Sequence, residues 1–342
     1  MPKLLIVTDA WTPQVNGVVT HIQNVSTGLK SEGIDVVVVH PGMFSRVLPL
    51  LFYPEIRMAY FPGMRMRAIF KKEKPDYVHI STEGSLGQTA RRICIQKKIP
   101  FTTFYHTNFP LYLQHYLHGG KALNGIAEKF IWAFHRKANA VFVSTEGMKR
   151  ELEEQGHSNV VVSLSGTDLS NFVRNEKKIP LEAEDLVMPI FVYFGRVAKE
   201  KNVEEFLELK LPGTKLVIGD GPLLKELHEE YANTASFVGY KTGQDLVDWL
   251  SVCDVCIFPS RTDTFGQVII EALACGIPVA AHDVLGPKDI ITPGVDGYLD
   301  EDLAKAAIAC LSLSRDNCRT KALKYSKEES VKAFWKNIQT YS

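Results

Sequence analysis

The chain has 342 residues, 45% of them hydrophobic and 23% charged, and its 39 basic residues balance its 39 acidic residues to a formal net charge of +0. That length suits about two domains of roughly 150 residues each, and the neutral balance argues against a protein that binds nucleic acid over its whole surface. No apolar run reaches the roughly 18 residues of a membrane span. The N-terminus enters a strand-like pattern at once, without the layout of a signal peptide, so we expect a cytoplasmic protein with reduced cysteines.

Short apolar, β-branched runs alternate with segments of helix length along the whole chain. Near-continuous apolar strands separated by helices are typical of parallel sheets that are covered on both faces. The pattern occurs twice, so we predict an α/β protein with two doubly wound, Rossmann-like domains. The expected strands are Leu4–Thr8, Val36–His40, Tyr77–Ser81, Phe101–Tyr105, Ala140–Ser144 and Val160–Leu164 in the first half, and Ile190–Phe194, Lys215–Ile218, Ser236–Val238, Val255–Phe258 and Pro278–Ala281 in the second.

A polar stretch from Asn171 to Asp185 separates the two halves and is the best candidate for a hinge or linker. We therefore place the first domain at residues 1–170 and the second at residues 186–325. Residues 326–342 are expected to form a helix that crosses back to the first domain, because apolar side chains recur on one helical face at Val331, Phe334, Trp335 and Ile338.

Loops that follow strands are the candidate binding segments, because ligands of doubly wound sheets bind at the carboxyl ends of the strands. Gly17 follows the first strand and could let a phosphate approach the backbone at a helix N-terminus. The alternative is an ordinary turn in which Asn16 caps the helix. His106 stands at the end of the fourth expected strand, where a ligand contact and a capping or core role are both open.

The tetrapeptide Ser-Thr-Glu-Gly occurs twice, at residues 81–84 and 144–147, each time after an expected strand. Capping of the following helix explains both copies adequately. In the first copy, Glu83 could also face a ligand cleft.

Two cations, Arg196 and Lys201, follow the first expected strand of the second half. Arginine offers a planar fork for phosphate oxygens, and lysine offers a compact point charge. Such a pair at a strand end could neutralise a diphosphate leaving group, whereas the alternative is two solvated surface charges. Further along, Gly219 to Pro222 matches half of a dinucleotide fingerprint, but Leu224 stands where the third glycine should be, so we favour a tight turn.

The stretch from Ser260 to Ala272 is the most informative part of the chain. It follows an apolar strand and opens an apolar helix, and its two carboxylates, Asp263 and Glu271, bracket the loop and the first helical turns. The N–H groups at the start of a helix favour phosphate, whereas carboxylates repel phosphate and suit sugar hydroxyls. This arrangement indicates a site for a nucleotide-sugar. The alternatives are that Asp263 caps the helix and that Glu271 pairs locally.

Together these segments resemble the retaining glycosyltransferases of the GT-B fold, the glycosyl transferases group 1 family, which includes bacterial α-mannosyltransferases and glycolipid synthases. The resemblance covers nearly the whole chain. It extends over Thr8 to Gly17, His79 to Gly84, Phe104 to Thr107, Gly195 to Asn202, Gly219 to Pro222 and Ser260 to Pro278. It implies two Rossmann-like domains that face each other across a cleft, with the acceptor on the N-terminal domain and the nucleotide-sugar donor on the C-terminal domain.

The resemblance also implies roles for the matched residues around the donor phosphates and ribose. Gly17 would lie beside the donor diphosphate, and Arg196 and Lys201 would bind it. Glu271 matches the second acid of the family's Glu-x7-Glu motif, which usually binds the ribose. Asp263 matches the first acid, which touches the transferred sugar, although this chain has Asp where the motif has Glu.

The remaining matched residues would contact the sugar and the base. Backbone groups of Thr264, Phe265 and Gly266 would hold sugar hydroxyls or phosphate. Val238 to Tyr240 would border the base, and His106 corresponds to the family's histidine near the transferred sugar.

The activity that we expect is retaining α-hexosyl transfer from GDP-mannose or a UDP-sugar to a hydroxyl group of a lipid or a saccharide. No covalent nucleophile and no aspartate-rich metal motif is evident, so we expect neither a metal nor a cofactor. His115 and His118 lack the glutamate of a zinc-protease arrangement, and Cys253 and Cys256 lack a second Cys or His pair, which makes core thiols the better interpretation.

Residues Phe44 to Lys72 are rich in apolar and basic side chains. We expect either a membrane-facing edge that reaches a lipid acceptor, with peripheral contact on the inner face of the membrane, or a core helix of the first domain with solvated charges. Two rival functions stay open, a dinucleotide-dependent oxidoreductase and a non-catalytic sugar-binding protein of two lobes.

Overall fold

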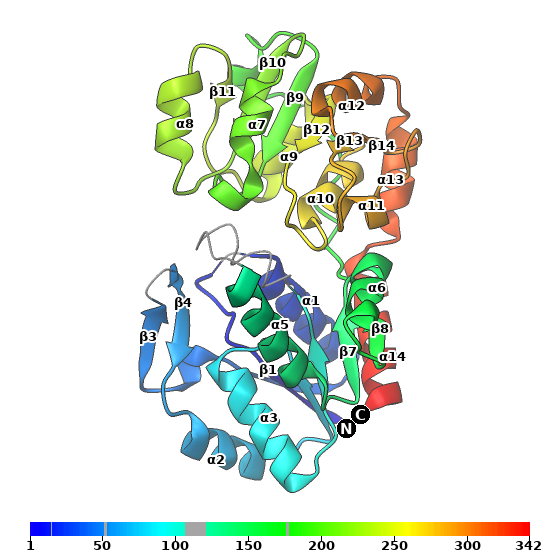
Figure 1. Ribbon diagram of the computed structural model, residues 1–342. Helices are drawn as coiled ribbons and strands as arrows, with labels where there is room; N and C mark the ends of the chain where they lie inside the picture. The colour runs from blue at the N-terminus through cyan, green and yellow to red at the C-terminus, as the bar shows by residue number, and fades with distance from the viewer. Residues whose placement is uncertain (15, 51–52, 107–120, 176–177) are drawn as a thin grey trace. The chain divides into compact units, whose positions relative to one another are not determined.

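The computed structural model describes residues 1–14, 16–50, 53–106, 121–175 and 178–342 (Figure 1). Thr107, His115 and His118, which are named above, lie outside these ranges. The chain divides into two compact units, Met1–Gly166 with Lys327–Ser342 and Thr167–Ser326.

The boundary between the units lies earlier than the polar stretch suggests. Residues 171–185, expected to be a linker, belong to the second unit. Leu169 and Ala183 are buried in the core of that unit, and Phe172 and Leu186 pack against it. A few apolar side chains at intervals are enough to fix a polar surface segment, and the composition of the stretch alone does not reveal them.

The first unit is built on a six-stranded parallel sheet of order β2-β1-β5-β6-β7-β8. Along β1, Leu4 and Ile6 contribute to the core on one face, whereas Leu5 and Val7 contribute to the core on the other. This period of two is the expected result when a strand is buried on both faces. The strands are β1 (Lys3–Val7), β2 (Asp35–Val39), β5 (Tyr77–Ile80), β6 (Thr102–Phe104), β7 (Ala140–Val143) and β8 (Val160–Val162).

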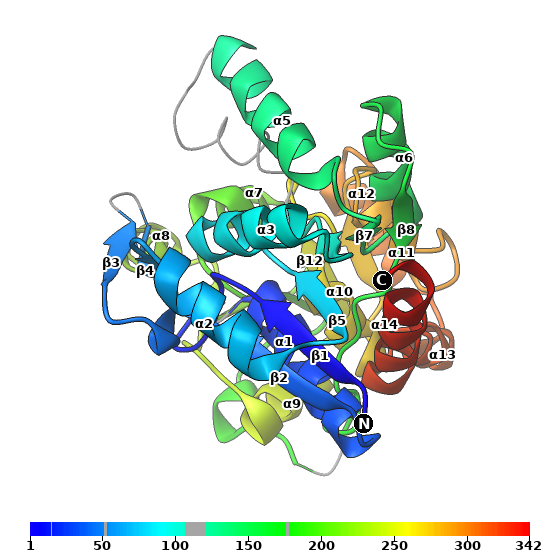
Figure 2. The same cartoon turned by 90° about the horizontal axis from the view of Figure 1, so that it is seen from below.

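Helices cover both faces of this sheet. One core contains side chains of α1 (Gly17–Ser31) and the C-terminal helix α14 (Lys327–Tyr341). The opposite core contains side chains of α2 (Gly63–Glu73), α3 (Ser85–Lys97) and α5 (Lys121–His135). Helices α2 and α3 lie side by side in Figures 1 and 2. The remaining helix, α6 (Glu146–Glu154), connects β7 to β8.

Close approach of two helices holds the C-terminal segment on the first unit. A side chain at Gly28 of α1 would place its Cβ 2.5 Å from a methyl group of Val331 on α14. Phe334 of α14 is fully buried, which stabilises the docked helix by about 2–3 kcal/mol. The segment from Lys327 therefore belongs to the first unit although the chain reaches it last, one residue later than the expected start at residue 326.

An antiparallel hairpin accounts for much of the segment Phe44 to Lys72. It consists of β3 (Val47–Leu50) and β4 (Tyr53–Ala59) and follows a short 3-10 helix, η1 (Pro41–Met43). The helical part of the segment begins at Gly63, with α2. The alternative of a core helix with solvated charges holds for α2 alone, which buries Met66, Ile69 and Phe70 and exposes Lys71 and Lys72. Before α2, Pro49 and Pro54 interrupt any helix, and both suit an edge hairpin.

The second unit repeats the architecture, with a parallel sheet of order β11-β10-β9-β12-β13-β14. Its last strand was not predicted, because three residues between turns give too short an apolar run. The strands are β9 (Ile190–Phe194), β10 (Thr214–Ile218), β11 (Ser236–Phe237), β12 (Val255–Phe258), β13 (Val279–Ala281) and β14 (Gly297–Leu299).

Two cores cover the faces of this second sheet. One core includes α9, α10 and α13, and the other includes α7, α8 and α12. All six cysteines are free and buried, as expected of core thiols. The helices are α7 (Val203–Glu208), α8 (Leu224–Tyr231), α9 (Gly243–Ser251), α10 (Gln267–Ala274), α11 (Pro287–Ile290), α12 (Leu303–Cys310) and α13 (Arg315–Leu323), with 3-10 helices η2 (Leu181–Ala183) and η3 (Lys199–Lys201).

Both sheets reverse their strand order at one point, between β1 and β5 in the first unit and between β9 and β12 in the second. In doubly wound proteins ligands bind at the carboxyl ends of the strands beside such a reversal. The loops after these four strands are therefore where function is expected. Within the described parts of the chain, every helix is too short or too polar to cross a lipid bilayer.

Candidate functional site

Glycines fix the loop between β12 and α10. Gly266 caps α10 with a φ of 79°, and a Cβ there would come within 2.8 Å of Ile269. Gly286 lies against the same loop, because a Cβ on it would sit 2.3 Å from the carbonyl oxygen of Asp263. Thr264 and Phe265, which lie between Asp263 and Gly266 in the loop, are buried. The loop therefore has a packed underside and a defined backbone path.

Asp263 and Lys201 meet at the carboxyl edge of the second sheet. The Nζ atom of Lys201 lies 2.6 and 2.8 Å from the two carboxylate oxygens of Asp263. The side chains are 27% and 22% exposed, so the pair adds at most about 1 kcal/mol to the free energy of unfolding. Its main effect is to hold the two side chains in place next to each other. An ammonium group has three N–H donors, so Lys201 can hold Asp263 and still donate to a phosphate oxygen. Asp263 does not cap α10, which removes one alternative from the sequence.

The loop after β9 carries Arg196. Gly195 N donates to Ile218 O at 2.9 Å, and Tyr193 Oη donates to Arg196 O at 2.6 Å. A Cβ at Gly219 would lie 1.8 Å from Gly195 O, so the glycine allows the loops after β9 and β10 to touch. The segment Gly219 to Pro222 is thus the tight turn favoured above, and it fixes the backbone that bears Arg196.

Glu271 lies on α10, one turn into the helix. Burial raises the pKa of its carboxyl group to about 8. Among the residues that the structure describes, no side chain or backbone group forms a hydrogen bond or an ion pair with this carboxyl group, so local pairing does not explain it. A carboxyl group of this kind can accept hydrogen bonds from sugar hydroxyls, and in its protonated form it can also donate one.

The segment after β11 completes this edge. Gly219 N donates to Gly239 O at 2.9 Å, which ties the segment to the turn after β10. Val238 packs against the core, whereas the ring of Tyr240 is 60% exposed. An exposed aromatic ring beside the carboxyl ends of the strands offers a stacking surface for a base.

In the first unit, Gly17 begins α1 and is exposed. The side chain of Asn16 caps the helix by accepting a hydrogen bond from Val19 N at 3.0 Å. The predicted cap therefore exists, and it leaves the backbone of Gly17 accessible at the helix N-terminus.

His106 lies in a cluster of imidazoles that the sequence did not reveal. Its ring stacks on Phe104 at 3.9 Å, and its Nε2 lies 2.9 Å from Ser81 Oγ. Burial, and then the neighbouring His21, His79 and His135, hold the pKa of His106 well below its usual range. Burial also lowers the pKa of His21 to about 4 and that of His79 to about 3. His106, His21 and His79 are therefore neutral at pH 7.

Asp9, after β1, has a structural task. Its carboxylate accepts hydrogen bonds from Leu86 N at 2.9 Å and Gly87 N at 3.3 Å, and from the hydroxyl of Thr82 at 3.0 Å. Burial raises the pKa of Asp9, and these hydrogen bonds oppose that shift. A Cβ at Gly84 would lie 2.4 Å from the carboxyl carbon of Asp9. Asp9 therefore caps α3, and the first Ser-Thr-Glu-Gly copy does not.

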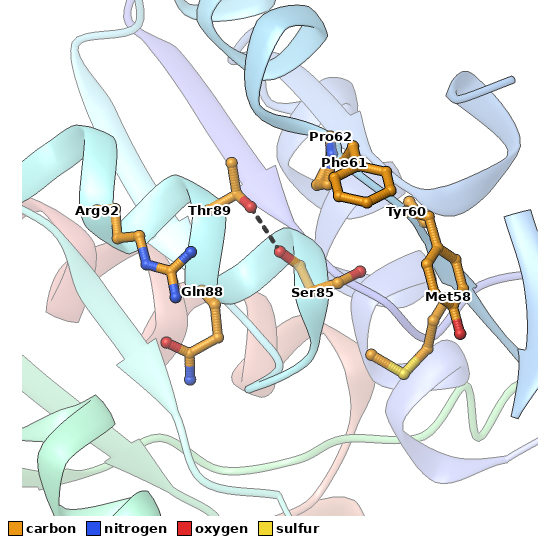
Figure 3. A pocket seen from close by; sticks show the side chains of 9 residues that line it. Met58, Tyr60, Phe61, Pro62, Ser85, Gln88, Thr89 and Arg92 are labelled. Carbon is orange, nitrogen blue, oxygen red and sulfur yellow. Dashed lines mark hydrogen bonds between the residues drawn. The ribbon is translucent and has the colours of Figure 1, made fainter. Parts of the chain in front are cut away.

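A cavity of about 430 Å³ opens on the first unit between the end of β4 and α3 (Figure 3). The wall on α3 is polar and includes Gln88 and Arg92, whereas Met58, Tyr60 and Phe61 form an apolar wall. Phe61 is 85% exposed and has a φ of 52°. The sequence indicated apolar and basic character here, but not a cavity.

Comparisons with known proteins place this geometry in a family. The model described as Glycosyltransferase Family 4 matches residues 15–171, and the model described as Glycosyl transferases group 1 matches residues 188–316. The chain belongs to the group 1 glycosyltransferases. This membership confirms the resemblance drawn from the motifs, and it makes the protein a transferase.

Relatives of this glycosyltransferase span nearly the whole chain. It is 28% identical to the GDP-mannose-dependent alpha-mannosyltransferase of Mycobacterium tuberculosis over 87% of the chain and 83% of the relative. It is 27% identical to the alpha-monoglucosyldiacylglycerol synthase of Streptococcus pneumoniae over 92% of the chain and 79% of the relative. HepE of Anabaena, solved in complex with UDP, matches 99% of this chain and 100% of its own with a TM-score of 0.71 and 16% identity, which confirms the GT-B fold.

Proposed function

We propose that this glycosyltransferase moves a hexose from a nucleotide-diphosphate sugar to a hydroxyl group, with retention of the α configuration and without a metal. The contact between Lys201 and Asp263 carries the proposal. It unites a cation for phosphate with an acid for sugar hydroxyls at the start of α10, and Glu271 follows on the same helix. Phosphate and sugar would be bound side by side at such a site.

The proposed chemistry uses the second unit to stabilise the leaving group. As the bond between the sugar and the diphosphate breaks, charge builds on the phosphate oxygens, and Arg196 and Lys201 would offset it. Asp263 would accept a hydrogen bond from the transferred hexose, and the backbone of Thr264 to Gly266 would hold hydroxyl or phosphate oxygens. The acceptor hydroxyl attacks from the face that the diphosphate leaves and passes its proton to the departing phosphate.

For the rest of the donor, Glu271 would bind the ribose, and Val238 to Tyr240 would border the base. In the first unit, Gly17 would approach the diphosphate, and His106 would meet the hexose as a neutral hydrogen-bonding group. We favour GDP-mannose over a UDP-sugar, since a GDP-mannose-dependent enzyme is among the relatives. The HepE complex with UDP keeps a UDP-sugar as the second candidate.

For the acceptor we propose a lipid or saccharide, with peripheral membrane contact at the first unit. Phe61 and Met64 are each 85% exposed, and α2 adds Arg65, Arg67, Lys71 and Lys72. Exposed apolar side chains beside basic ones suit the surface of an anionic membrane. A glycolipid synthase among the relatives supports a lipid acceptor. Flotation with anionic vesicles is the test, and protein that stays at the bottom of the gradient removes the membrane contact.

A donor and acceptor screen tests the proposed function. GDP-mannose and UDP-glucose are incubated with the protein and with diacylglycerol vesicles or methyl α-mannoside, in EDTA. Released nucleoside diphosphate, product mass and anomeric configuration are measured. We expect an α-linked product with one of these combinations. Intact donors throughout would support the rival sugar-binding protein, and a β-linked product would contradict retention. The rival oxidoreductase is disfavoured by the family.

A further inference from the structure

One carboxylate at the edge of the first sheet has no part in the scheme above. Glu83 follows β5, next to the reversal of strand order in the first unit. Its Oε1 atom lies 3.1 Å from Nε2 of His135, and Nδ1 of His135 lies 2.8 Å from Thr103 Oγ1. The His135 side chain is fully buried, whereas that of Glu83 is 25% exposed. A buried imidazole thus holds a carboxylate at the surface.

Hydrogen-bonding capacity explains what this arrangement offers. A carboxylate oxygen accepts hydrogen bonds, so the tautomer of His135 that suits this contact carries its proton on Nε2, and the hydroxyl of Thr103 then donates to Nδ1. Among the described residues, Oε2 of Glu83 has no hydrogen-bond partner. The buried His135 therefore orients the carboxylate from the protein interior, and the second oxygen stays available for a hydroxyl group.

The second Ser-Thr-Glu-Gly copy shows what the same tetrapeptide does without such a partner. There Thr145 caps α6 by accepting a hydrogen bond from Met148 N at 3.2 Å, and Glu146 is exposed in the first helical turn. In the first copy Asp9 supplies the cap, so Glu83 is not needed for it. The two glutamates share a sequence context and differ in their surroundings.

We infer that the carboxylate of Glu83 binds the hydroxyl group of the acceptor that receives the hexose, and that His135 is the residue that positions this carboxylate. The inference deepens the proposed function and rests on it. The diphosphate-binding cations lie on the second unit, whereas Glu83 lies on the first, at the position where a doubly wound domain binds its ligand. A carboxylate suits a neutral polyol there and disfavours a second phosphate group.

Kinetics of Glu83→Gln test the inference, with the donor and acceptor that the screen above identifies. The amide keeps the shape but presents N–H groups where the carboxylate accepts. We expect kcat/KM for the acceptor to fall about 10- to 100-fold, the effect of losing a hydrogen bond to a charged group. The KM for the donor and its slow hydrolysis by water should stay within about twofold of wild type. Glu146→Gln is the matched control and should behave as wild type.

Further variants cover the case in which Glu83→Gln does not fold. Glu83→Asp keeps the charge but withdraws it by one methylene, and a smaller loss confined to the acceptor is expected. His135→Gln, which can still donate to Glu83, should retain more acceptor kcat/KM than His135→Leu at matched thermal stability.

Three results would overturn the inference. One is an acceptor kcat/KM within twofold of wild type in a folded Glu83 variant, and another is an equal loss in the donor KM. The third is a wild-type protein that turns over no donor. That result contradicts the proposed function itself, and the wild-type measurement alone distinguishes it from a failure of the inference about Glu83.

Discussion

The two units are both built on a six-stranded parallel sheet with one reversal of strand order, but they differ at the carboxyl ends of the strands. In the second unit the edge is charged and includes Arg196 and the Lys201–Asp263 pair. In the first unit the edge carries neutral imidazoles such as His106 and two carboxylates, Asp9, which is used to cap α3, and Glu83, which has one oxygen without a hydrogen-bond partner among the described residues. The strand order gives both units a binding edge, and the side chains on it decide what is bound there. A charged edge suits a diphosphate, and a neutral edge suits hydroxyl groups.

The loops are also fixed by different means in the two units. In the second unit glycines allow backbones to touch, as at Gly219 and Gly286. In the first unit Gly87 allows a similar approach, since a Cβ there would lie 1.8 Å from Thr82 O, but there a side chain, Asp9, also reaches across to cap α3.

The largest effect is expected at Gly219. Gly219→Ala would place a Cβ 1.8 Å from Gly195 O on a backbone with a φ of 155°, so we expect a loss of about 4 kcal/mol in the free energy of unfolding. Gly33→Ala is the control, since it has a φ of 83° but open space, and should cost about 1 kcal/mol. Urea denaturation measures both. Equal losses would show that contact between the loops is unimportant.

Arg196→Ala should lower donor turnover about 10²- to 10³-fold, or about 3–4 kcal/mol, if the guanidinium stabilises the leaving diphosphate. Arg261→Ala is the matched control on the neighbouring loop, where Arg261 pairs with Glu301 at 3.0 Å and is 43% exposed. That variant should stay within about threefold of wild type. Steady-state release of nucleoside diphosphate compares them, and unchanged turnover in Arg196→Ala removes its assignment.

Glu271→Gln should change how stability depends on pH. The folded pKa of Glu271 is raised to about 8 from 4.5, so the folded state binds the extra proton between these values, and wild-type stability is lost as pH rises through that window. Glu271→Gln removes this dependence. The difference in free energy of unfolding between the variant and the wild type should therefore shift in favour of the variant by up to about 3 kcal/mol from pH 5 to pH 8. Denaturation curves at several pH values test this, and parallel profiles would contradict it.

The opposite slope is expected in the first unit. His21 has a folded pKa of about 4 against 6.5 unfolded, so the unfolded state binds more protons in that window and stability is lost as pH falls from 6.5. Both ring nitrogens of His21 lack a hydrogen-bond partner among the described residues. On acidification from pH 7 to 5, the free energy of unfolding of His21→Leu should therefore rise by about 2 kcal/mol relative to that of the wild type. Amide hydrogen exchange in α1 at both pH values measures this change in stability. The same loss of protection on acidification in the variant and the wild type would refute the prediction.

Much of the architecture could be predicted from the sequence, because many of the buried strands are continuous apolar runs such as Val255–Phe258. The β3–β4 hairpin was missed, since β3 is a short apolar run that contains Pro49 and β4 mixes apolar and charged residues without a clear run.

At the candidate site, the sequence indicated Lys201 and Asp263 as binding residues. Their contact could not be predicted, because they are 62 residues apart in the chain. The imidazole cluster and the Glu83–His135 pair depend on burial and on tertiary neighbours. No local pattern encodes either.

The most direct test of the central claim compares Lys201→Ala with Lys199→Ala. Both lysines lie on η3, but Lys201 contacts Asp263 whereas Lys199 is exposed. Nucleoside diphosphate released from GDP-mannose or UDP-glucose is measured with and without acceptor. We predict a loss of about 100-fold or more for Lys201→Ala and wild-type turnover for Lys199→Ala. Equal turnover in both variants, or no turnover of any donor by the wild type, would contradict a donor site at the edge of the second unit.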